Sequence, residues 1–203
     1  MQIFSPSHTP CSSQSNIRFR TKGFTLIELL ISLALIGVIT TVTLANYKGF
    51  DSTTILKGQA YEIALALRET QAKSLSVVRD SGSGSFDYPY GLSFTRSWNT
   101  YTLFKDINGN TIYSGTSEDL SIITMDGKMQ VSDLCVVVSG VEACSAVRLD
   151  ISFKRPEFKA FLYAGPSFSG IESAKIKVNT TSSPGDVFVI EISQFGQISV
   201  SNE

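Results

Sequence analysis

Histidine is almost absent from this chain of 203 residues, which has one, at position 8. The chain beyond Gly23 has none, so that part lacks the side chains for Ser-His-Asp or Cys-His nucleophilic catalysis and for a histidine-ligated metal site. Carboxylate-only catalysis remains an alternative, but no spacing of acidic residues points to it. We therefore expect a protein that is not an enzyme and that uses no metal and no cofactor.

Acidic residues are absent from residues 1–23, which are polar and end in a basic cluster of Arg18, Arg20 and Lys22. This segment also lacks an apolar run before its end, so it is not an ordinary secretory signal. The net charge is −1 for the whole chain, and residues 24–203 hold 14 basic and 18 acidic side chains, a net charge of −4. No strong positive field therefore favours a nucleic-acid partner.

Charged residues are scarce in residues 24–45, where Glu28 is the single one in an otherwise apolar run. As a helix, this run would be about 33 Å long, close to the roughly 30 Å hydrocarbon core of a bilayer. The preceding basic cluster places its start in the cytoplasm. A plain signal anchor is the alternative, and it leaves Glu28 unexplained, because a carboxylate inside a membrane span marks a functional site by default.

The stretch "KGFTLIELLISLALIGVI" resembles the prepilin signal that type IV pilins share with the pseudopilins of type II secretion. In that family a basic leader ends in Gly, Phe usually follows, Glu occupies the fifth mature position, and an apolar helix continues. Here these elements are Gly23, Phe24, Glu28 and the run to Ala45.

The resemblance implies cleavage between Gly23 and Phe24 by prepilin peptidase, N-methylation of Phe24 and assembly into a filament through the helix. Glu28 would then pair with the positive amino group of a neighbouring Phe24. The implied location is the cytoplasmic (inner) membrane, crossed once, with the N-terminus inside and the rest extracytoplasmic. The implied partners are the peptidase, other pilin or pseudopilin subunits, the membrane and a secreted substrate.

The resemblance and the residue patterns together divide the chain into four parts. Residues 1–23 form the leader, 24–45 the transmembrane and assembly helix, 46–79 its amphipathic continuation, and 80–203 a β-rich extracytoplasmic domain. We expect a polar break at 49–54 and then a helix to about Val78. Its apolar face has a helical spacing and consists of Ala60, Ile63, Ala64, Leu67, Gln71, Leu75 and Val78, with Arg68, Glu69 and Lys73 outward.

Nine short β-rich runs follow a loop at 80–91: "GLSF", "TYTLFK", "TIYS", "LSIITM", "LCVVV", "VRLDISF", "FKAFLY", "AKIKV" and "DVFVIEIS". One long helix followed by many strands predicts an α+β fold, pilin-like in the terms of the resemblance, with the helix packed on an antiparallel sheet. "YGLSF", "YTLFKDINGN", "VIEISQFGQISV" and the helix end "ALALRETQAKSLSVVRDSG" are similar to the GspH/FimT group of minor pseudopilins. That group has a Gly-containing first strand and a last hairpin that turns at Gly.

Two local patterns are candidates for a metal site or a disulfide. Asp106, Asn108 and Asn110 resemble the start of a calcium loop, but the later Gly and Glu of that motif are missing, so we expect a hairpin turn at Asn108-Gly109. Cys135 and Cys144 flank a Ser-Gly turn, and outside the cytoplasm they predict a disulfide; two buried thiols are the alternative.

A third pattern is a group of basic residues interleaved with Phe153, Phe158 and Phe161, which predicts either a small nucleic-acid patch or a solvated strand face. The basic residues are Lys154, Arg155, Lys159, Lys175 and Lys177. The patch matters because some FimT-like minor pilins take part in DNA uptake. We therefore hold two functions open: a minor pilin-like structural subunit of a secretion pseudopilus or pilus, which we prefer, and a DNA-binding minor pilin.

Overall fold

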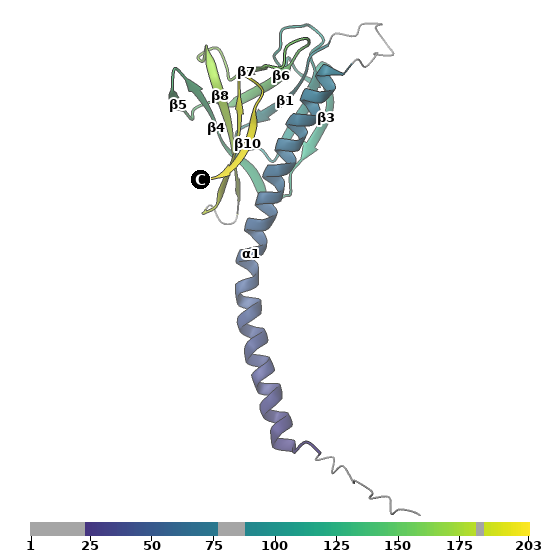
Figure 1. Ribbon diagram of the computed structural model, residues 1–203, viewed down its shortest axis with the longest axis vertical. Helices are drawn as coiled ribbons and strands as arrows, with labels where there is room; N and C mark the ends of the chain where they lie inside the picture. Colours follow the sequence, from purple (N-terminus) through teal and green to yellow (C-terminus); the bar gives the residue numbers. More distant parts are fainter. Residues whose placement is uncertain (1–22, 77–87, 182–184) are drawn as a thin grey trace, which may run out of the picture. The chain divides into compact units, whose positions relative to one another are not determined.

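A computed structural model describes residues 23–76, 88–181 and 185–203, without the side chains of residues 45–52 (Figure 1). The chain forms two compact units, residues 1–45 and 46–203, and we call the second unit the head.

A single helix, α1 (Leu26–Leu75), contributes to both units. The expected break at 49–54 is wrong, because the backbone is helical through these residues. Helix propagation is cooperative, and the long helical runs on both sides carry the helix through a segment of low propensity. The helix ends three residues before Val78, which lies outside the described residues.

One face of α1 in the head is buried, as its spacing predicts. Leu56, Ala60, Ile63 and Leu67 have no exposed surface, and the buried face continues through Thr70 and Ser74. The structure leaves Gln71 and Leu75 half-buried. The residues expected to point outward, Arg68, Glu69 and Lys73, are exposed. This face packs against the strands of the head (Figure 1).

Ten strands and one short 3-10 helix follow α1 among the described residues. They are β1 (Tyr90–Thr95), β2 (Thr100–Lys105), η1 (Thr116–Glu118), β3 (Asp119–Thr124), β4 (Met129–Val138), β5 (Val141–Ala143), β6 (Arg148–Phe153), β7 (Ala160–Tyr163), β8 (Ile171–Thr180), β9 (Val187–Ser193) and β10 (Ile198–Asn202). The α+β class with antiparallel strands is therefore confirmed.

The strands form two antiparallel sheets where the sequence predicted one. Sheet A has the order β3-β2-β1-β6-β7, and sheet B has the order β10-β9-β8-β4-β5. The core draws side chains from α1 and from both sheets, for example Leu67, Phe94 and Ile176. Each sheet buries one face in this shared core, so a period-2 pattern alone could not tell one sheet from two.

The predicted strand "TIYS" is wrong, since residues 111–114 lie in the long connection between β2 and β3. This connection, residues 106–118, folds over the face of sheet A that is turned away from the core. Its backbone pairs with side chains instead of a strand: Tyr113 N–H donates to Asp150, and the Ser152 hydroxyl donates to the Thr111 carbonyl. Period-2 alternation does not distinguish such a loop from a strand.

Two glycines allow close packing in the head. A Cβ on Gly91, in β1, would lie 2.5 Å from the Phe104 ring and 2.6 Å from the Ile151 carbonyl oxygen. Gly196 lies in the turn between β9 and β10 and has a φ of +80°. A Cβ on Gly196 would lie 2.4 Å from the carbonyl oxygen of Phe158. No larger residue fits either position without movement of backbone or ring.

Candidate functional site

The site that the sequence singles out begins where α1 begins. The Oγ1 of Thr25 accepts a hydrogen bond from the backbone N–H of Glu28 at 3.3 Å, and the Thr25 carbonyl accepts one from Leu29 N–H at 3.2 Å. Threonine directly before a helix, with glutamate three residues later, is the capping-box pattern. Thr25 therefore caps α1, and Glu28 lies in its first turn, where the helix dipole favours a negative charge. Sequence reasoning missed this cap, although the T-x-x-E spacing could have shown it.

Glu28 has no cation within its own apolar segment. The side chains from Gly23 to Leu44 are all exposed, and Phe24 is 82% exposed. No Lys or Arg occurs between Phe24 and Leu44. No side chain of residues 24–44 therefore supplies a counter-charge for Glu28, whereas an amino terminus at Phe24 would supply one.

The first part of α1 is suited to hydrocarbon. Leu26–Leu44 has a mean hydropathy of 2.2 and is long and apolar enough to cross a membrane. Its hydroxyls are satisfied internally, because Ser32, Thr40 and Thr43 donate to the carbonyl four residues earlier at 2.7 to 3.0 Å, and Thr41 donates to Gly37. A span without water needs this internal pairing of its polar groups.

Asp106, the first residue of the calcium-like stretch, is engaged by its own loop. Its carboxylate is fully buried and accepts the backbone N–H groups of Gly109, Asn110 and Thr111 at 2.6 to 3.2 Å. The expected hairpin turn at Asn108-Gly109 is corrected in one respect: Gly109 has a φ of +78°, as a turn requires, but it lies inside the connection 106–118 and does not close the hairpin.

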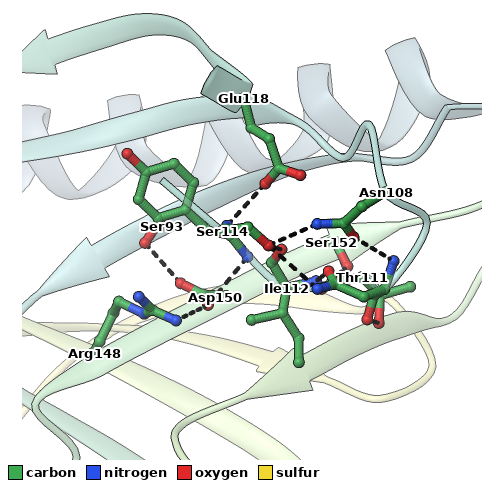
Figure 2. A network of polar contacts seen from close by, with 11 residues as sticks. Ser93, Asn108, Thr111, Ile112, Ser114, Glu118, Arg148, Asp150 and Ser152 are labelled. Carbon is green, nitrogen blue, oxygen red and sulfur yellow. Dashed lines mark hydrogen bonds and ion pairs between the residues drawn. The ribbon is translucent and has the colours of Figure 1, made fainter. Parts of the chain in front are cut away.

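Two further buried carboxylates hold the same connection against sheet A (Figure 2). Glu118 accepts Ser114 N–H at 2.8 Å and Ile107 N–H at 3.3 Å. Asp150 accepts the Ser93 hydroxyl at 2.6 Å and Tyr113 N–H at 3.3 Å, and its Oδ2 lies 3.0 Å from the Arg148 guanidinium.

Burial raises the pKa of Asp150 above its usual range, although the Ser93 hydrogen bond and the Arg148 charge oppose that shift. Burial of these acids was not predicted from the sequence, because Asp and Glu are rarely buried unless they are paired.

The structure joins Cys135, in β4, to Cys144 by a disulfide. Between them Glu142 lies beside Lys175 at 2.5 Å. The hydrogen bond from Lys175 lowers the pKa of Glu142. Among the described residues, the two cysteines and Glu142 form the one close group of His, Cys, Asp or Glu donors with metal-binding geometry. Since both sulfurs are in the disulfide, neither is available as a thiolate ligand.

The basic residues predicted as a patch come from two sheets. Lys154, Arg155 and Lys159 lie between β6 and β7 of sheet A, whereas Lys175 and Lys177 lie in β8 of sheet B. Three of the five are paired with acids: Lys159 with Glu157, Lys175 with Glu142, and Lys177 with Glu203. Of the three interleaved aromatics, Phe153 is fully buried and Phe158 is 69% exposed.

Comparison with known families matches residues 18–44 to the prokaryotic N-terminal methylation motif. No curated protein and no solved structure matches the chain. The matched segment contains Gly23, Phe24, Thr25 and Glu28, so the chain carries a type IV pilin-like prepilin signal there. Such a signal implies processing by prepilin peptidase and assembly with other pilin subunits, and with the apolar helix it is consistent with a membrane-anchored pilin.

Proposed function

We propose that the protein is a minor pilin-like subunit, a pseudopilin of a type II secretion pseudopilus or a subunit of a type IV pilus. The observation that carries the proposal is the methylation motif at residues 18–44, which coincides with an exposed apolar helix containing one charge. Membership in the GspH/FimT group is part of the proposal, supported by the glycines of β1 and of the last hairpin. The role is structural, and no catalysis and no cofactor is proposed.

The proposed mechanism joins subunits through the start of α1. Cleavage after Gly23 creates an amino group on Phe24 that is protonated at neutral pH before and after methylation. Glu28 of one subunit pairs with the Phe24 amino group of its neighbour, which neutralises two charges that hydrocarbon would otherwise disfavour. The Thr25 cap supports this pairing because it fixes the first helical turn, where Glu28 lies. The head then lies on the extracytoplasmic side of the membrane. On that side, secreted substrate or other subunits contact it.

The first experiment is mass spectrometry of the amino terminus, in cells with and without prepilin peptidase. We expect a mature chain that begins at N-methylated Phe24 only when the peptidase is present. An intact Met1, or a cut at another position, would return the segment to a plain membrane anchor.

A second experiment tests assembly. Glu28→Gln should leave membrane insertion and head stability unchanged but remove most incorporation into filaments. Ser32→Ala is the matched control, since it removes a polar group one turn further along whose hydroxyl bonds only the Glu28 carbonyl. Normal incorporation of Glu28→Gln, or an equal loss in both variants, would contradict the role of the charge.

DNA binding is the second candidate, and the exposed Phe158 between Arg155 and Lys159 is the observation in its favour. The ion pairs of Lys175 and Lys177 count against it, because paired lysines release fewer counterions. Binding of single-stranded DNA that weakens steeply with salt and is lost in Phe158→Ala would support this candidate. If no binding of single-stranded DNA is seen even at low salt, the DNA-binding function is excluded.

A further inference from the structure

A groove of about 570 Å³ opens at one end of the head, beside strand β6. It is lined by Thr95 at the end of β1, by residues 145–148, and by residues 163–168 between β7 and β8. Its volume lies within the range of clefts that bind small ligands or single side chains of a partner. Tyr163, Pro166 and Phe168 give it an apolar and aromatic wall.

Arg148 is the charged residue in this lining. Figure 2 shows its guanidinium reaching Asp150, whose carboxylate is fully buried. The ion pair of 3.0 Å involves one terminal nitrogen of a planar group that carries five N–H donors, and 41% of the Arg148 side chain remains exposed. A ligand entering the groove therefore meets the guanidinium and not the carboxylate behind it.

The turn after β1 lies next to this groove. The backbone N–H of Trp98 donates to the carbonyl of Thr95, a lining residue, at 3.3 Å, and Trp98 is 59% exposed. Val147, also in the lining, is 63% exposed, and its carbonyl accepts a hydrogen bond from Arg96 N–H at 2.9 Å. Tyrosine and arginine are enriched among the hot spots of protein interfaces, and both line the groove as Tyr163 and Arg148.

We propose that this groove is a docking site for a short segment of a partner protein that presents a carboxylate next to a large apolar side chain. The carboxylate binds the exposed part of the Arg148 guanidinium, and the apolar side chain packs against Tyr163 and Phe168. An acid suits this groove because Arg148 is the charged residue of its lining, 41% of the Arg148 side chain is exposed, and the carboxylate paired with it, Asp150, is buried. The site lies wholly in the head and does not depend on filament assembly.

The test uses the full-length protein in detergent micelles and the fluorescence of Trp98, the only tryptophan of the chain. The probes are two blocked tetrapeptides of matched shape, acetyl-Ala-Asp-Phe-Ala-amide and acetyl-Ala-Asn-Phe-Ala-amide. We expect a saturable fluorescence change with the acidic peptide and a dissociation constant about tenfold higher with the neutral one, the effect of losing one charge-assisted hydrogen bond.

A matched pair of variants locates the binding. Val147→Asp places a carboxylate at the rim beside Arg148 and should weaken the acidic peptide about tenfold. Val141→Asp is the control, since Val141 is 68% exposed but belongs to β5 of the other sheet. The absence of a saturable change, equal affinity for both peptides, or equal weakening in both variants would overturn the proposal.

Discussion

The two ends of helix α1 contain similar residues in opposite situations. Leu33 is 58% exposed and every side chain from Gly23 to Leu44 is exposed, whereas Leu56, Ile63 and Leu67 have no exposed surface. The first part must find an apolar environment outside the unit, and the second part finds it in the core of the head. One continuous helical backbone therefore lies in two different environments, and the arrangement of its apolar side chains determines which environment suits each part.

The acids of the two units differ in the same way. Asp150 is buried in the head with a hydroxyl, a backbone N–H and a guanidinium around it. Glu28 has its Thr25 cap on the backbone, but no cation in its own segment. The partners of Asp150 therefore lie within its own unit, whereas Glu28 needs a positive partner from outside the side chains of its segment.

The largest effect expected from this comparison comes from one leucine in each part of α1. Leu67→Ala should lower the free energy of unfolding of the head by about 2–5 kcal/mol, because it leaves a cavity in the core. Leu33→Ala should leave head stability unchanged, because Leu33 contributes nothing to that core. Chemical unfolding of both full-length variants in the same detergent measures the difference. A matching loss in Leu33→Ala would show that the first part of the helix also stabilises the head.

Removal of the Cys135–Cys144 disulfide ranks next. Replacing both cysteines by alanine should lower the free energy of unfolding by about 2–3 kcal/mol, since a short closed loop no longer restricts the unfolded chain. The effect belongs to the head, so insertion of the apolar helix should not change. The matched check is reduction of the wild-type protein, which should reproduce the loss. Wild-type stability in the double variant would mean that the bridge is dispensable.

The sequence predicted the helix, the α+β class and the prepilin segment, because each has a strong local signal. Helical spacing marks the buried face of α1, and a long apolar run with one acid marks the assembly segment. The sequence did not predict the second sheet or the loop conformation of residues 111–114. Both depend on contacts between distant residues, such as Tyr113 N–H with Asp150, that no local pattern encodes.

The buried acid Asp150 should give the stability of the head a pH dependence. Since burial raises the pKa of Asp150, the folded head keeps a proton that the unfolded chain releases first. The contribution of this group to stability is therefore full below its ordinary pKa and is lost as the pH rises through its raised pKa. Urea unfolding of wild type and Asp150→Asn, measured from pH 3 upward, isolates the effect. We expect the stability of wild type relative to the variant to fall with rising pH, and a rise would contradict the sign.

The smallest effect should come from the surface acid Glu142. Glu142→Gln removes a pair with Lys175 that is 36% exposed on the acid side, so the loss of stability should be at most about 1 kcal/mol and should shrink as salt is added. Because the pKa of Glu142 is lowered, this contribution should be full above the ordinary pKa of a glutamate and should be lost as the pH falls through the lowered pKa. Glu62→Gln is the control, because Glu62 is an exposed acid on the outward face of α1 and does not belong to the pair with Lys175. A salt-independent loss of several kcal/mol would contradict this prediction. It would show that Glu142, although exposed, contributes to the stability of the head as strongly as a buried acid.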